Sequence, residues 1–251
     1  MPSVLQKLSA RHRIDSYILV MFLAAAAGIL LFLKLGSEIL EGDSFAIDRY
    51  LLQCLRRSSD SAIPIGPAWL RSAMVDISAL GGINLLTLIT LLASGYLLAA
   101  RKQVTALFLP ISIAAGGAMS ALFKIEYARP RPDIVKHLVE VSSASFPSGH
   151  AMNSAIVYLT VGALLARAEQ APRVRIYIIS VAICLTLAIG SSRIYLGVHW
   201  PSDVVAGWCV GASWAAMALL IAHRLPGARA GVGPESLSGS SVYLSNRDHE
   251  S

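Results

Sequence analysis

Three short polar clusters interrupt a largely apolar sequence, and each combines side chains that can bind a phosphate or react with it. In chain order they are Lys124-x6-Arg131-Pro132, Pro147-Ser148-Gly149-His150 and Ser192-Arg193-x5-His199-x3-Asp203. Charged residues this close to hydrocarbon are energetically costly and tend to be functional. The clusters are therefore the first candidates for a reactive site.

The cations and the helix start in these clusters suit an anion. Lys124, Arg131 and Arg193 can neutralise the charge that spreads over the equatorial oxygens of a transferring phosphoryl group. Ser148 and Gly149 stand at a predicted helix start, where free backbone N–H groups and the helix dipole attract anions. Taken singly, Arg131 could equally anchor at lipid headgroups, and Pro-Ser-Gly is an ordinary helix start. The combined spacing favours a phosphate site.

The two histidines suggest covalent chemistry. His199 and Asp203 are four residues apart at a helix start, so the carboxylate can hold one ring nitrogen and leave the other free. This is the arrangement of an oriented, activated nucleophile. His150 then remains as a proton donor for the leaving oxygen.

The composition indicates a membrane protein. Of 251 residues, 55% are hydrophobic and 14% charged, against about 25% charged in an ordinary soluble domain. Three cysteines exclude a disulfide scaffold. The net charge of +6 could indicate a nucleic-acid partner, but the basic residues are scattered between apolar stretches, as expected of charges that flank membrane spans. We expect an integral membrane protein with no nucleic-acid partner.

Apolar runs predict an all-α fold, a bundle of six transmembrane helices. A bilayer core of about 30 Å needs roughly 20 apolar residues in a helix. The predicted spans are residues 17–35, 83–100, 104–123, 148–166, 176–191 and 202–222. Between the first two, residues 45–57 place Ile47, Leu51 and Leu55 on one helical face, which predicts an amphipathic helix on the membrane surface.

Charge placement predicts the domain layout and orientation. Residues 1–225 form one membrane domain, and the Gly- and Ser-rich residues 226–251 form a disordered cytoplasmic tail. The first span lacks a small-residue cleavage site and is predicted to be retained. Short positive segments, among them Arg101-Lys102, place both termini in the cytoplasm. All three polar clusters then lie on the opposite face, which is periplasmic if the membrane is a bacterial inner membrane.

In order and spacing, the three clusters resemble the tripartite signature of the type 2 phosphatidic acid phosphatase (lipid phosphate phosphatase) superfamily. They span residues 124–203, and no signature position departs from the pattern. The resemblance implies that His199 forms a phosphohistidine, that Asp203 orients it and that His150 protonates the leaving group. It assigns phosphate binding to Lys124, Arg131, Ser148, Gly149 and Arg193, and it implies no metal and no cofactor.

The resemblance predicts a membrane phosphatase that hydrolyses a lipid phosphate or diphosphate. Bacterial proteins that the chain resembles act on phosphatidic acid, phosphatidylglycerophosphate, undecaprenyl diphosphate or lipid A phosphates, and undecaprenyl diphosphate is our first choice. A lipid phosphotransferase using the same phosphohistidine is the main alternative. A vanadium-dependent haloperoxidase shares the anion site, and a non-enzymatic transporter or scaffold is the remaining alternative.

Other polar residues near the first cluster are predicted to have no role in the reaction. Arg129 and Lys136 flank the cluster, and we interpret them as solvated loop charges rather than guides for anionic headgroups. His137 is interpreted as an ordinary loop residue.

Overall fold

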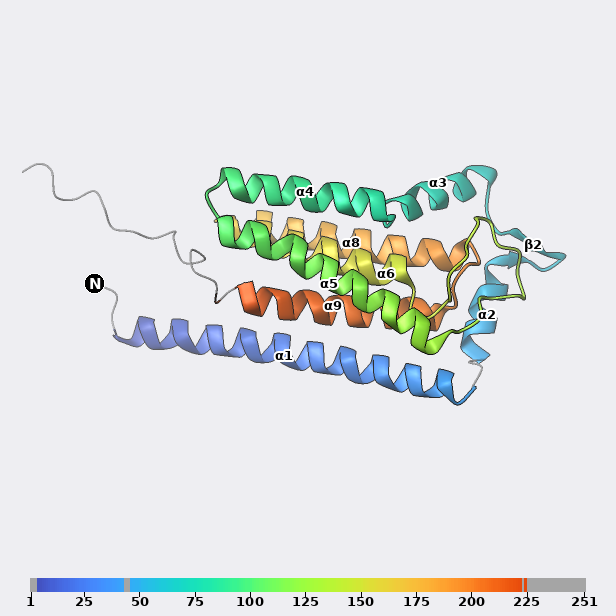
Figure 1. The fold of residues 1–251 in the computed structure, drawn as a ribbon, viewed down its shortest axis with the longest axis horizontal. Helices are drawn as coiled ribbons and strands as arrows, with labels where there is room; N and C mark the ends of the chain where they lie inside the picture. The colour runs from blue at the N-terminus through green and yellow to red at the C-terminus, as the bar shows by residue number, and fades with distance from the viewer. Residues whose placement is uncertain (1–3, 43–45, 223, 225–251) are drawn as a thin grey trace, which may run out of the picture.

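The chain folds into a bundle of long helices with a small cap at one end. The computed structural model describes residues 4–42, 46–222 and 224. The helices are α1 (Val4–Leu40), α2 (Ala46–Cys54), α3 (Ala68–Ala79), α4 (Ile83–Ala99), α5 (Gln103–Tyr127), α6 (Gly149–Ser154), the π-helical turn η1 (Ala155–Leu159), α7 (Thr160–Ala168), α8 (Pro172–Tyr195) and α9 (Pro201–Ala222). In Figure 1 the long helices run side by side, and α2 lies across the end at which α1 finishes.

Five helices are long and apolar enough to cross a membrane. They are Leu19–Leu40, Gln103–Tyr127, Gly149–Ala168, Pro172–Tyr195 and Pro201–Ala222. Helices α3 and α4 pass the same test only together, and they are bent by 48° at the break between them. The predicted total of six is reached if this bent pair counts as one span. Many large apolar side chains are exposed on the outer helices, as lipid-facing surfaces require. The chain is an integral membrane protein, as predicted.

The segment between the first two predicted spans differs from the expectation. A helix forms there, but α2 ends at Cys54 rather than at residue 57. The chain then turns into a short antiparallel hairpin, β1 (Arg56–Arg57) with β2 (Asp60–Pro64), so the fold is mostly rather than entirely α-helical. Buried Arg56 donates a hydrogen bond to the Tyr195 carbonyl at 3.0 Å, which holds the hairpin against the end of α8.

Helix α2 has a buried face and an exposed apolar face. Leu52 and Asp48 are buried, whereas Ile47 and Leu51 are exposed. An exposed apolar face on a short helix at the bundle end is compatible with the predicted position at the membrane surface. The predicted tail, residues 226–251, lies outside the described residues.

Glycines on α9 bring the start of α6 close to the start of α9. A Cβ at Gly207 would lie 2.8 Å from the Ser148 carbonyl oxygen, and one at Gly211 would lie 2.5 Å from the Met152 carbonyl oxygen. Both distances are too short for a real side chain, so only glycine allows this approach. The second and third polar clusters meet because these two helices pack so closely.

An aromatic cluster holds α1 and α5 against the connection that leads into α6. The rings of Phe32 and Phe146 stack with their centroids 5.6 Å apart, and the Tyr127 ring meets Phe146 edge-on at 4.8 Å. Figure 1 shows that the connection after α5, the hairpin and the start of α9 all lie at the same end of the bundle. The three polar clusters therefore share this end.

Candidate active site

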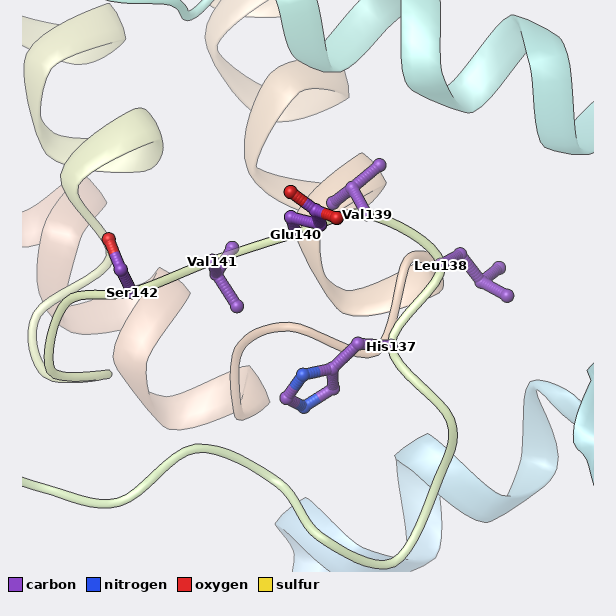
Figure 2. Close-up of a pocket in the computed structure, with 6 residues that line it drawn as sticks. All are labelled: His137, Leu138, Val139, Glu140, Val141 and Ser142. Atoms are coloured by element: carbon purple, nitrogen blue, oxygen red, sulfur yellow. The ribbon is translucent and has the colours of Figure 1, made fainter.

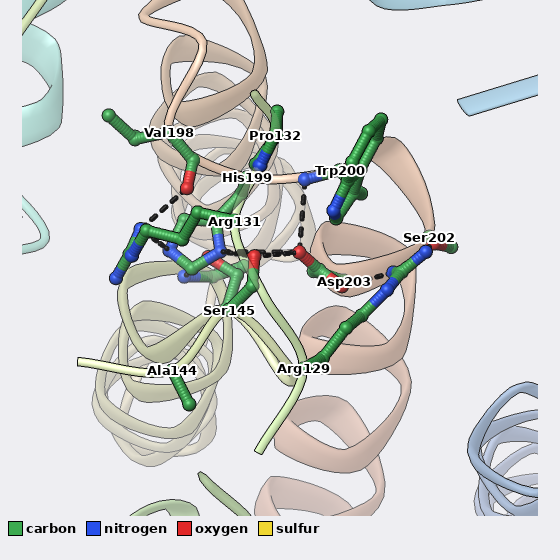
Figure 3. A network of polar contacts seen from close by, with 12 residues as sticks. Arg129, Arg131, Pro132, Ala144, Ser145, Val198, His199, Trp200, Ser202 and Asp203 are labelled. Atoms are coloured by element: carbon green, nitrogen blue, oxygen red, sulfur yellow. Dashed lines mark hydrogen bonds and ion pairs between the residues drawn. The ribbon is translucent and has the colours of Figure 1, made fainter. Parts of the chain in front are cut away.

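His199 lies in the turn between α8 and α9, and its two ring nitrogens have different neighbours. Nδ1 is 3.5 Å from the Asp203 carboxylate and 3.3 Å from the Ser145 hydroxyl, whereas Nε2 is 3.3 Å from Arg131 Nη1 (Figure 3). Burial lowers the pKa of His199 to about 4, although Asp203 opposes the shift. The ring is therefore neutral at neutral pH, and with the proton on Nδ1 the Nε2 lone pair is directed at Arg131 Nη1 and the cavity.

The start of α9 explains why Asp203 stands in this position. Pro201 occupies the first helical position, which favours helix initiation. Asp203, two residues later, accepts a hydrogen bond from the Trp200 N–H at 2.9 Å and so caps the helix. The Ser145 hydroxyl donates to the same carboxylate oxygen. Asp203 is completely buried, and these donors compensate for its removal from water.

Three cations from different elements converge near His199. Lys124 Nζ donates to the Ala144 carbonyl at 2.5 Å, and Arg131 Nε donates to the Ser143 carbonyl at 2.8 Å. Arg193 Nη1 donates to the Ser78 hydroxyl of α3 at 2.7 Å. Within the described part of the chain, the buried Nε of Arg193 has no hydrogen-bond partner. A buried donor without a partner is unfavourable and suits a site that is completed by an anionic ligand.

One cavity of about 340 Å³ joins most of the predicted site residues. Its lining includes six of the eight predicted residues: Lys124, Arg131, Gly149, His150, Arg193 and His199. Asp203 is buried behind His199. Ser148 is also fully buried, and its hydroxyl accepts from the Ala151 N–H at 3.5 Å as the cap of α6. Helix α3 forms another wall through Val75, Ser78 and Ala79, a contribution that the sequence did not indicate.

A second hollow of about 660 Å³ lies along the connection between α5 and α6. It is lined by residues 137–142, drawn in Figure 2. Residues 139–142 line both hollows, so this stretch is the wall that they share. His137 is held by a 2.7 Å contact between its Nε2 and the Pro132 carbonyl, and it does not line the smaller cavity.

The interpretation of Arg129 as a solvated loop charge is wrong. Its side chain is 9% exposed, and Nη1 donates to Asp203 Oδ1 at 2.5 Å (Figure 3). Nη2 donates to Asp48 of α2 at 3.0 Å. The physical reason is that two buried carboxylates need a cation between them. The sequence offered no indication of this contact, because Asp48 is 81 residues away.

The arrangement is suited to phosphoryl transfer. Among the described residues, no group of three or more His, Cys, Asp or Glu side chains is placed to hold a metal ion. Lysine and arginine side chains line the cavity that the His199 ring also lines. Fixed positive groups of this kind stabilise the charge that develops on phosphoryl oxygens.

Fold and site together define a helical membrane protein with a cavity lined by cations and histidines at one end of its bundle. Residues 105–226 match the family model described as the PAP2 superfamily. Phosphatidylglycerophosphatase B of Bacillus subtilis (strain 168) is 34% identical over 157 residues, which are 61% of this chain and 75% of that protein. The chain belongs to the PAP2 superfamily, which confirms the family predicted from its three motifs.

Further similarities agree with this assignment. A crystal structure described as the first transmembrane PAP2 type phosphatidylglycerolphosphate phosphatase, from Bacillus subtilis, has a TM-score of 0.70 and 26% identity, and the match covers 80% of this chain and 96% of that one. An undecaprenyl-diphosphatase of Sulfolobus acidocaldarius is 39% identical over 70 residues, which are 28% of this chain and 29% of that protein.

Proposed function

We propose that this protein removes phosphate from a lipid phosphate or diphosphate through a phosphohistidine at His199. The carrying observation is that His199, with Asp203 behind it, lines the same cavity as Lys124, Arg131 and Arg193. A nucleophile with its orienting carboxylate and a set of phosphate-binding cations are the parts that the reaction needs. Membership of the PAP2 superfamily and relatives named as phosphatases support the same class, a phosphoric ester hydrolase.

In the proposed first step, the Nε2 lone pair of His199 attacks the terminal phosphorus, and the bond from that phosphorus to the leaving oxygen breaks; this oxygen is the lipid alcohol's in a monophosphate and the bridging oxygen in a diphosphate. His150 donates a proton to that oxygen as it leaves. The phosphorylated ring carries a positive charge, which the Asp203 carboxylate stabilises. In the second step His150 takes a proton from water, the water oxygen attacks phosphorus, the P–N bond breaks, and inorganic phosphate leaves.

The substrate test is a comparison of lipid phosphates on one purified protein. We propose undecaprenyl diphosphate as the first candidate substrate and phosphatidylglycerophosphate as the second. Relatives are named for each of these two activities. The purified protein in detergent is offered each lipid, and inorganic phosphate is measured with the His199→Ala variant as blank. Phosphate release from neither lipid would contradict the two proposed substrates. Transfer of phosphate to an added acceptor lipid, in place of release, would identify a phosphotransferase.

Activity is expected to survive an excess of chelator. Lys124, Arg131 and Arg193 supply the charge that a divalent cation supplies in many phosphoryl-transfer enzymes. Initial rates are measured with and without EDTA, and then with orthovanadate, which can occupy the phosphoryl position and is expected to inhibit. Loss of activity in EDTA that added Mg²⁺ restores would contradict this mechanism.

The site is proposed to face the periplasm, with both termini in the cytoplasm. Ser142, at the site end, and Gln170, in the connection between α7 and α8, are both exposed and suit single-cysteine labelling. The background lacks Cys54, Cys184 and Cys209. In intact cells an impermeant thiol reagent is expected to label a cysteine at 142 and to spare one at 170. The reverse pattern would invert the proposed orientation.

A further inference from the structure

A single guanidinium bridges two buried carboxylates behind the His199 ring. Asp48 of α2 is 1% exposed and Asp203 of α9 is 0% exposed. Arg129 Nη2 lies 3.0 Å from Asp48 Oδ2, and Arg129 Nη1 lies 2.5 Å from Asp203 Oδ1. Asp48 lines no part of the cavity, so it does not contact a bound phosphate.

Asp48 is also attached to the first turn of α9. The Ser202 N–H donates to Asp48 Oδ1 at 2.8 Å, and the Ser202 hydroxyl donates to Asp48 Oδ2. Ser202 directly precedes Asp203, and Arg129 Nη1 also donates to the Ser202 hydroxyl at 2.8 Å. Asp48 therefore contacts Arg129, which is paired with Asp203, and Ser202, which precedes Asp203 in the chain.

We propose that Asp48 is a positioning residue of the reaction, which shares Arg129 with Asp203 and so leaves one unbalanced negative charge directed at His199. The inference rests on the proposed function of His199 as the nucleophile. Asp48, Arg129 and Asp203 form a cluster of two carboxylates and one guanidinium, and these three groups together carry a net charge of one negative unit. The phosphorylated His199 ring is positive, and the unbalanced charge stabilises it.

Without Asp48, Arg129 would be paired with Asp203 alone, and the cluster would be neutral. Charges in a buried site are poorly screened, so the loss of one charge is felt by a neighbouring ring. A neutral cluster stabilises a cationic His199 less, which lowers the pKa of the ring and weakens it as a nucleophile. Removing Arg129 instead gives two negative units and the opposite shift.

The remaining charged groups around His199 stay the same in every variant. They are Asp203 of α9, Arg131 of the connection after α5, Lys124 of α5, His150 of α6 and Arg193 of α8, with Glu140 on the cavity wall. The substrate phosphate also titrates, but it does so equally in all variants. Differences between variants therefore report the Asp48–Arg129 pair.

The test compares Asp48→Asn, Arg129→Gln and the double variant, whose clusters carry net charges of zero, minus two and minus one. Phosphoenzyme formation is followed by rapid quench at saturating lipid phosphate over a range of pH. Neutral His199 is the reactive form, so the rate of phosphoenzyme formation falls at low pH as the ring becomes protonated. The position of this fall, the acid limb of the pH profile, follows the pKa of His199 in the enzyme–substrate complex. The limb is expected to move to lower pH in Asp48→Asn and to higher pH in Arg129→Gln, each by about 0.5 to 1.5 units. It is expected to return to the wild-type position in the double variant.

Rates and folding are measured on the same preparations. Formation of the phosphoenzyme at neutral pH is expected to slow about 3- to 30-fold in Asp48→Asn. Asp133→Asn, an exposed carboxylate on the same connection as Arg129, is the matched control and is expected to leave the limb in place. If Arg129→Gln does not fold, the comparison of Asp48→Asn with the double variant decides.

Two results would overturn the inference. One is an unmoved acid limb in Asp48→Asn, with any loss of rate explained by less folded protein. The other is a shift of the same sign in both single variants. If the wild-type protein itself forms no phosphoenzyme from any lipid phosphate, the proposed function has failed, and the inference fails with it.

Discussion

Turnover of every phosphate ester is expected to fall by about 10⁴-fold or more when His199 is replaced by alanine, as for the nucleophiles of other covalent enzymes. Among the described residues, His199 is the side chain on the cavity wall that has a carboxylate within ion-pair distance, that of Asp203. The loss should therefore be independent of the leaving group. Inorganic phosphate release from a lipid phosphate and p-nitrophenol release from p-nitrophenyl phosphate both measure it.

His137→Ala is the matched control for this prediction. It also removes an imidazole from the site end of the bundle, but His137 does not line the cavity that contains His199. This variant is expected to keep its turnover. Residual His199→Ala activity that remains sensitive to orthovanadate would contradict the assignment of His199.

The effect of replacing His150 by alanine should depend on the leaving group. His150 lines the same cavity as His199 and is the proposed proton donor. Proton donation contributes about 10²- to 10⁴-fold in rate, roughly 3 to 5 kcal/mol of barrier. An alkoxide that leaves from a lipid monophosphate is strongly basic and needs the proton, whereas a nitrophenolate needs it far less. Phosphoenzyme formation should therefore slow much more with the lipid monophosphate.

Rapid quench of His150→Ala with both substrates measures this difference. With p-nitrophenyl phosphate, hydrolysis of the phosphoenzyme should become rate-limiting, because His150 is also the proposed base for the attacking water. Equal losses in the formation step for both substrates would remove His150 from the acid role. It would then remain only a phosphate ligand.

The membrane helices, and the meeting of the three motifs at one end of the bundle, were predictable from the sequence because both depend on the local spacing of residues. A run of roughly 20 apolar residues has few alternatives to a membrane helix. Once the spans are placed, the ends of α5 and α8 and the starts of α6 and α9 must lie on one face. The structure brings Lys124, His150 and His199 to one cavity at that face.

Helix α3 and the hairpin were not predictable in the same way. Helix α3 has 12 residues and carries Arg71 and Asp76, so its hydropathy does not indicate a span by itself. It passes the test for a span only together with α4. The two strands of the hairpin have two and five residues, too few for a clear alternation of apolar and polar side chains.

The buried polar network is the largest part of the site that the sequence did not reveal. Considered alone, the segments that contain Asp48, Arg129 and Ser145 have the sequence of a surface helix or a solvated loop. Ser145 and Arg129 are buried by contacts with Asp203, 58 and 74 residues away in the chain. Asp48 is buried by contacts with Arg129 and Ser202, 81 and 154 residues away. A pattern search along the sequence does not detect contacts at such separations.

The most direct test of the account is to identify the residue that carries the phosphoryl group. The protein is mixed with a lipid phosphate labelled with ³²P, quenched within a turnover, digested and mapped. We expect an acid-labile, base-stable label on the peptide that contains His199, and no label in the His199→Ala variant. A label on any other residue, or hydrolysis that proceeds with no label at all, would contradict it.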